Sequence, residues 1–242
     1  MRLLSIPLIA LLLIAAGPAE EAERLLDAGR EREAFELVER LAGEGDAEAV
    51  YALGWFYDEG RYVAQDDVRA VRLYRQAAEA GQVRAQWRLG VMLDLGEGAR
   101  ADPAEAVTWF RRAAAQGYAR ALNSLAVMHA TGRGVRLDYG EARRLYEQSA
   151  RMGEPHGFYG VGVLHAMGQG VPVDPVEAFA WFAVAASLGD ESAVGAMRQT
   201  ELSRAQAERA AARAEDIARE YGIDAPAVLG GEEADERPVP VT

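Results

Sequence analysis

A repeat of 36 residues is the feature that most restricts how this chain can fold. Glycines open five successive segments with no insertion or deletion between them, at Gly45, Gly81, Gly117, Gly153 and Gly189. The same kinds of residue return at the same offsets, including an aspartate at Asp66, Asp102, Asp138 and Asp174. A fixed period of roughly 20 to 50 residues indicates small structural units that stack on their neighbours. We therefore expect four full repeats, over residues 45–80, 81–116, 117–152 and 153–188.

Each repeat is predicted to form two helices joined by a glycine-rich turn. Helix A, the first, is expected over about 46–58 in the first repeat, because its apolar residues recur at helical spacing. Helix B, the second, is expected to start at the recurring aspartate, a favoured N-cap residue. In three repeats a glutamate follows the aspartate by three residues, which predicts a capping box for the pairs Asp102–Glu105, Asp138–Glu141 and Asp174–Glu177. Their return in successive repeats favours this role over paired catalytic carboxylates.

The composition argues against several functional classes. The net charge is −12, and the chain contains arginines but no lysine, so the basic footprint of a nucleic-acid-binding protein is missing. Cysteine is absent, which excludes disulfides, thiolate nucleophiles and cysteine-based metal sites. The three histidines are not spaced as metal ligands; they are His129, His156 and His165. We therefore expect no catalytic residues, no metal site and no cofactor.

The N-terminal residues are typical of an exported protein. Met1-Arg2 is followed by an apolar stretch over residues 3–16, and small residues stand where a signal peptidase cleaves. Residues 1–19 are therefore predicted to be a signal peptide, because the apolar stretch is shorter than the ~20 residues of a membrane span. The chain has no cysteine for lipid attachment. We expect a periplasmic or secreted protein that does not insert in the membrane after signal removal; the alternative is an uncleaved membrane anchor.

Partial repeats are expected to close both ends of the array. Residues 20–44 are predicted to form a helical half-repeat that acts as a cap. Residues 189–224 are predicted to form a partial repeat, with a helix A over 191–199 and an amphipathic closing helix over 202–221. Residues 225–242 are rich in acidic residues and proline, a composition that predicts disorder.

Three stretches carry a resemblance to a known family. They are Gly45-Asp46-Ala47-Glu48-Ala49 with Leu53-Gly54 and Tyr57, the run from Trp109 to Gly117, and Gly132-Arg133-Gly134-Val135 with Asp138. Over residues 45–189 the chain resembles the Sel1-like repeat family, relatives of the tetratricopeptide repeat. Departures are mild: Ala126 replaces the helix A glycine, and His129 and His165 stand where Tyr57 does. The resemblance implies an all-α fold, a right-handed α-solenoid of stacked helix-turn-helix repeats that forms a tetratricopeptide-like superhelix.

The resemblance also implies that the A helices line a concave groove. The groove residues expected to bind a partner are Glu48, Tyr51, Trp55, Arg84, Trp87, Arg88, Arg120, Asn123, His156 and Tyr159. They include an aromatic row and a basic step formed by Arg84, Arg88 and Arg120, and such residues dominate binding hot spots. This set would suit a peptide that carries a carboxylate. The alternative is that Tyr51 and Trp87 simply pack between repeats.

The function predicted on this basis is a non-enzymatic scaffold, adaptor or regulator in the bacterial envelope. It would act as a monomer and bind a protein or peptide through the groove. One alternative is a periplasmic hydrolase of the β-lactamase-like repeat type. It is disfavoured because those members depend on a disulfide in each repeat, and this chain has neither cysteine nor a serine-nucleophile motif. Another alternative is a structural subunit of an envelope assembly, such as a polysaccharide export complex.

Overall fold

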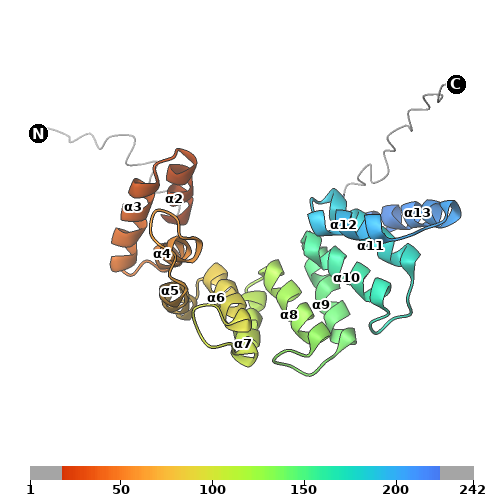
Figure 1. The fold of residues 1–242 in the computed structure, drawn as a ribbon, viewed down its shortest axis with the longest axis horizontal. Coiled ribbons are helices and arrows are strands. Elements are labelled where there is room, and N and C mark those ends of the chain that lie inside the picture. The colour runs from red at the N-terminus through yellow and green to blue at the C-terminus, as the bar shows by residue number, and fades with distance from the viewer. Residues whose placement is uncertain (1–17, 224–242) are drawn as a thin grey trace, which may run out of the picture. The chain divides into compact units, whose positions relative to one another are not determined.

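The computed structural model describes residues 18–223, and in that range all regular structure is helical, which confirms the predicted all-α fold (Figure 1). The helices are α2 (Pro18–Asp27), α3 (Glu31–Gly43), α4 (Ala47–Glu59), α5 (Asp67–Glu79), α6 (Val83–Leu95), α7 (Pro103–Ala115), α8 (Ala119–Thr131), α9 (Tyr139–Arg151), α10 (Pro155–Met167), α11 (Pro175–Ser187), α12 (Glu191–Gln199) and α13 (Arg204–Glu220). The predicted signal peptide, apart from its last two residues, and the predicted disordered tail lie outside the described residues. No helix between residues 18 and 223 is long and apolar enough to cross a bilayer.

The helix pairs reproduce the period of the sequence. Four pairs form the repeats, namely α4–α5, α6–α7, α8–α9 and α10–α11, and every one of these eight helices has 13 residues. Each A helix starts 36 residues after the one before it, at positions 47, 83, 119 and 155. The fold is therefore an α-solenoid of helix-turn-helix repeats.

The chain divides into two compact units. Unit 1 holds the described residues up to Ala121 together with Arg133–Arg136, and unit 2 holds Leu122–Gly132 together with the described residues from Leu137 onward. In unit 1, α2 and α3 pack together and onto α4, and α5 packs between α4 and α6. In unit 2, α11 packs against α10, α12 and α13.

In the core of each unit, a glycine of helix A lies against an aromatic ring of helix B. In unit 1, a Cβ added to Gly90 would lie 2.5 Å from the ring of Phe110. In unit 2, a Cβ added to Gly162 would lie 2.6 Å from the ring of Phe182. Both rings are buried, at 2% and 3% exposure. The recurring glycine is thus explained by the close approach of a bulky ring from the helix of the same repeat.

The recurring aspartates cap the B helices as predicted, but the capping boxes predicted for Asp102, Asp138 and Asp174 are wrong. Asp102 Oδ1 accepts the amide of Glu105 at 2.9 Å, while the Asp102 amide donates to the carbonyl of Leu93 at the end of helix A. Since this carbonyl already satisfies the N-cap amide, the glutamate that follows bonds elsewhere. The carboxylate of Glu105 accepts hydrogen bonds from Arg75 and Trp109. That of Glu141 accepts from Arg144, and that of Glu177 accepts from Arg213.

The turn between helix A and helix B also contacts the repeat before it. Gly98 has a φ of +66°, and a Cβ added there would lie 2.1 Å from the carbonyl oxygen of Asp67. Gly134 approaches the carbonyl of Pro103 in the same way. The first repeat departs from this pattern, because Tyr62 occupies the position with a φ of +61° and its ring lies 5.3 Å from that of Phe35. In the second and third repeats only glycine fits without displacing the neighbouring backbone.

The helices predicted at the C-terminal end are present. Helix α12 spans Glu191–Gln199, as expected, and α13 begins and ends within the expected range of 202–221. Ser203 caps α13 in a full capping box with Gln206. The ring of Tyr221, after the end of α13, packs against Phe158 at 5.2 Å and Trp181 at 5.4 Å. These contacts join the closing helix to the last complete repeat.

Candidate functional site

The ten residues predicted to bind a partner fall in both units, and each group is described within its own unit. Unit 1 carries seven of them on α4, α6 and the first turn of α8, namely Glu48, Tyr51, Trp55, Arg84, Trp87, Arg88 and Arg120. Unit 2 carries Asn123, His156 and Tyr159.

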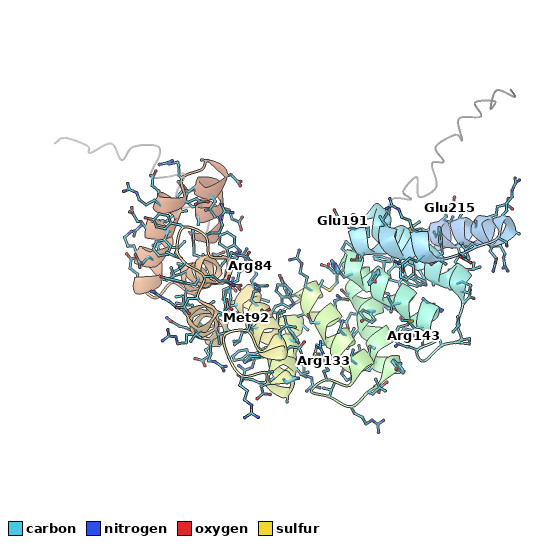
Figure 2. All side chains as sticks on the ribbon, viewed as in Figure 1. Arg84, Met92, Arg133, Arg143, Glu191 and Glu215 are labelled. Atoms are coloured by element: carbon cyan, nitrogen blue, oxygen red, sulfur yellow. The ribbon has the colours of Figure 1, made fainter. Side chains whose placement is uncertain are left out.

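In unit 1, Arg84 of α6 lies against α4 (Figure 2). Its Nη2 donates to Glu48 Oε1 at 3.0 Å, and its Nη1 lies 3.8 Å from Glu23 Oε1. The guanidinium lies over the ring of Tyr51, 5.0 Å from the centroid, as a cation–π contact requires. The Tyr51 ring also packs 5.6 Å from that of Tyr74, and burial raises the pKa of Tyr51. Tyr51 therefore packs between repeats and still leaves part of its side chain exposed.

Arg88 belongs to a buried polar network. One oxygen of Asp58, Oδ2, accepts from Arg88 Nε at 2.9 Å, from Arg88 Nη2, and from the Tyr74 hydroxyl at 2.8 Å. The Asp58 side chain is only 7% exposed. Burial alone would lower the pKa of Arg88, but the hydrogen bond and charge of Asp58 outweigh it and raise that pKa. Burial also raises the pKa of Tyr74, and the Asp58 charge adds to the effect.

These contacts correct one expectation about charge. The sequence predicts that Arg84 and Arg88 contribute to a basic step able to hold a partner's carboxylate. Both instead pair with carboxylates of the preceding repeat, because residues 30 or 36 positions apart meet where helices stack. Glu59 adds a further carboxylate 3.8 Å from Arg88. This part of unit 1 is therefore not basic.

The aromatic side chains predicted to line the groove in unit 1 contact arginines and other aromatic rings. Arg120 lies over the ring of Trp87, 5.9 Å from the centroid, and Tyr118 packs 5.8 Å from the same ring. Arg84 over Tyr51 repeats this arrangement one repeat earlier, with the same separation of 33 residues in sequence. Trp55 packs edge-on against Phe56 at 5.4 Å.

Trp55 also lines a pocket of about 170 Å³ beside α2. Besides Trp55, the walls come from Ala22, Glu23 and Leu26 of α2 and from Tyr51, Ala52 and Phe56 of α4. The contribution of α2 to this pocket is not predictable from the repeat. Its residues lie before the periodic region, so no offset in the repeat indicates which of them meet α4.

In unit 2 the three predicted residues have different surroundings. Tyr159 packs against Phe182 with ring centroids 5.4 Å apart. Asn123 Oδ1 is buried and accepts no hydrogen bond from the described residues. The His156 side chain is 60% exposed, and its Nδ1 lies 3.1 Å from Glu154 Oε1 and 4.0 Å from Asp190 Oδ2.

The charged side chains that line a second cavity of unit 1 form structural bonds. An open cavity of about 500 Å³ in unit 1 is lined by Arg75, Asp102 and Glu105, but Asp102 caps α7 and Glu105 binds Arg75. The hydrogen bond from Arg75 lowers the pKa of Glu105, and Trp109 adds to the effect. Between residues 18 and 223, no three acidic or histidine side chains are grouped so that they could hold a metal ion.

Several solved structures of repeat proteins are similar to this chain. A Sel1 repeat protein from Oxalobacter formigenes is 30% identical, and the match covers 84% of this chain and 84% of that protein with a TM-score of 0.65. The protective antigen c5321 of uropathogenic Escherichia coli strains, which displays an SLR fold, is 27% identical with a TM-score of 0.73. That match covers 90% of this chain and 48% of the antigen, so the chain spans about half of the antigen's length. A sel1 repeat protein from Klebsiella pneumoniae subsp. pneumoniae, 20% identical over 76% of this chain and 91% of that one, shares the fold with a TM-score of 0.54.

Comparison of sequences agrees with the structural matches. No curated protein sequence matches this chain. The Sel1 repeat model matches four consecutive segments, residues 47–82, 83–118, 119–154 and 158–190, which together make up more than half of the chain. These segments contain the helices of the four pairs, α4–α5 to α10–α11, except for residues 155–157 at the start of α10. On this evidence the chain belongs to the Sel1 repeat family.

Proposed function

We propose that this chain is a non-enzymatic scaffold or adaptor of the bacterial envelope that binds a protein partner, as a monomer, through its A helices. Sel1 repeat proteins are generally protein-interaction scaffolds. Support for a binding role comes from the continuity of contacts along unit 1, where Glu48, Arg84 and Tyr51 form one group and Trp87 and Arg120 form the next.

The observation that carries the proposal is the repeated pairing of an arginine with a partly exposed ring on consecutive A helices. Tyr51 lies under Arg84 and Trp87 lies under Arg120, and both rings are only partly buried. Each ring is also fixed by a second aromatic contact, with Tyr74 or Tyr118. Side chains that are already ordered lose little conformational entropy on binding, which favours association with a partner.

The envelope location rests on the N-terminal sequence, where Met1-Arg2 and an apolar stretch precede small residues. Cell fractionation of the native host with a C-terminal tag tests it, together with N-terminal sequencing of the purified protein. A mature chain starting near residue 18 or 20 in the periplasmic or secreted fraction is the expected outcome. A full-length chain in the membrane fraction would instead indicate an uncleaved anchor.

The binding role is tested by in-cell crosslinking and pull-down from the native host. The variant combines Trp87→Ala with Arg120→Ala, which removes one ring and its arginine. The matched control is Arg111→Ala, which removes an exposed arginine from the B helix α7. We expect the control to recover the same partner as the native chain and the double variant, shown to be folded by circular dichroism, to lose it. Recovery of that partner by the folded double variant would contradict binding through this face.

A further inference from the structure

The pocket between α2 and α4 has the size and the walls of a site for one side chain. Its volume is about 170 Å³, close to the ~150 Å³ of an engineered cavity that binds benzene. Ala22 and Ala52 carry the smallest side chains around it, while Leu26, Tyr51 and Trp55 supply larger apolar surface. A pocket of this size is well below the range of about 300–1,000 Å³ typical of small-molecule sites. An aliphatic or small aromatic side chain would fit it.

The charged side chains beside the pocket favour a positively charged ligand. Glu23, the acidic residue of the pocket wall, is 67% exposed at its side chain. Arg84 is closer to Glu48, at 3.0 Å, than to Glu23, at 3.8 Å. One guanidinium therefore serves two carboxylates, and a net negative charge remains at this edge of unit 1. The whole chain, with a net charge of −12, adds a long-range attraction for cations.

We infer that this pocket is the anchor site for a cationic segment of a protein partner. The segment would place an aliphatic or small aromatic side chain between α2 and α4, and an adjacent arginine or lysine would pair with Glu23. Arg84 shows within the chain how a guanidinium fits here, since it lies over Tyr51 and between two carboxylates. The inference rests on the proposed function and specifies the chemistry of the partner, which is basic rather than acidic.

The test uses the full chain labelled with 5-fluorotryptophan and observed by fluorine NMR. The chain has four tryptophans, so Trp→Phe variants assign the Trp55 signal. The probes are acetyl-Leu-Arg-amide, acetyl-Leu-Glu-amide and acetyl-Ala-Arg-amide. Acetyl-Leu-Arg-amide should shift the Trp55 signal saturably, with a dissociation constant of about 1–10 mM, because one side chain and one ion pair contribute little affinity. The glutamate probe should bind about two- to fivefold more weakly, as loss of an exposed ion pair predicts. The alanine probe should bind about tenfold more weakly, since it lacks the anchor.

Two variants distinguish the contribution of the apolar pocket from that of the ion pair with Glu23. Ala22→Leu fills the pocket and should abolish the Trp55 shift. Because Ala22 is buried, its replacement by leucine also disturbs the packing of α2, so Glu23→Arg provides a second variant at an exposed position. It should reverse the preference, so that acetyl-Leu-Glu-amide binds more tightly than acetyl-Leu-Arg-amide. Glu39→Arg makes the same charge change at an exposed position of α3 and should leave the preference as it is in the native chain.

Several outcomes would overturn the inference. One is a Trp55 signal that does not move with any probe up to about 10 mM, where such weak contacts should be visible. Another is equal binding of the arginine and glutamate probes. A Trp55 signal that shifts with protein concentration alone would show that a second copy occupies the pocket. If the crosslinked partner is lost by Trp87→Ala with Arg120→Ala and retained by Glu23→Arg, the proposed function stands and the pocket inference fails.

Discussion

The Tyr74 hydroxyl donates a 2.8 Å hydrogen bond to Asp58 Oδ2, the same carboxylate oxygen that holds the guanidinium of Arg88. The three residues come from α5, α4 and α6, so the network ties the first repeat to the second. The arrangement compensates a carboxylate that would otherwise be costly to bury.

Replacing Arg88 by alanine should destabilise the chain by about 2–4 kcal/mol, because the Asp58 carboxylate would be left in a buried site with only Tyr74 as donor. Urea unfolding at neutral pH measures the effect. Arg111→Ala is the control, since Arg111 is exposed on α7, and it should cost about 0.5 kcal/mol or less. Equal losses for the two variants would show that the buried network contributes no special stability.

Replacing Phe110 by tyrosine should stabilise the chain by about 1 kcal/mol. Phe110 stands one repeat after Tyr74, and Asp94 stands one repeat after Asp58. Asp94 Oδ2 binds Arg133 at 2.8 Å, but Oδ1 is buried and accepts no hydrogen bond from the described residues. A hydroxyl at position 110 should reach this carboxylate as Tyr74 reaches Asp58.

The matched control for that substitution is Phe182→Tyr in the fourth repeat, where Ala166 replaces the aspartate. The added hydroxyl has no carboxylate to bind there and should bring no gain. Thermal unfolding of both variants is sufficient for the comparison. A gain in both, or in neither, would contradict the assignment of Asp94 as the acceptor.

Gly98→Ala should be severely destabilising, by about 3 kcal/mol or more, through a steric clash added to backbone strain. The new Cβ would lie 2.1 Å from the Asp67 carbonyl oxygen in the preceding repeat. Gly81→Ala separates the two causes, since Gly81 has a φ of +95° but nothing within 4 Å of an added Cβ. It should cost about 1 kcal/mol, the strain of a left-handed alanine. Denaturant unfolding of both variants tests the difference, which should disappear if the turn can move away from its neighbour.

Stability should fall at alkaline pH, and Tyr146→Phe should remove part of the fall. Burial raises the pKa of Tyr146 to about 12, whereas an unfolded tyrosine titrates near 10. Between these values the unfolded chain releases a proton that the folded chain retains, so stability declines as pH rises from about 10 to about 12. The contribution of this side chain is on the order of 2 kcal/mol.

The measurement is urea unfolding of both chains at pH 8 and pH 11. Tyr146→Phe should lose less stability than the native chain between the two conditions. Parallel losses would show that Tyr146 ionises as readily in the folded chain as in the unfolded one. Tyr159→Phe provides a comparison at a neighbouring tyrosine that is only partly buried.

The sequence was sufficient to predict the helices because their signals are local. An aspartate at the start of helix B and a glycine after helix A act within a few residues, and the period of 36 repeats these signals along the chain. The partners of Arg84 and Arg88 were not predictable in the same way. They depend on which faces of adjacent repeats meet, and the pocket depends on α2, which is outside the periodic region. The capping boxes failed for a similar reason, since the carbonyl of Leu93 that satisfies the Asp102 amide belongs to the preceding helix.

The turns at Gly98 and Gly134 limit how such a chain can diversify. Each turn bonds the N-cap amide of its own repeat to helix A and also lies against the backbone of the repeat before it. Adding or removing a residue there would disturb two repeats at once, whereas a whole block of 36 residues preserves every junction. Duplication or deletion of complete blocks, followed by surface substitutions, is therefore the route by which this architecture can change length while it keeps the contacts between successive repeats.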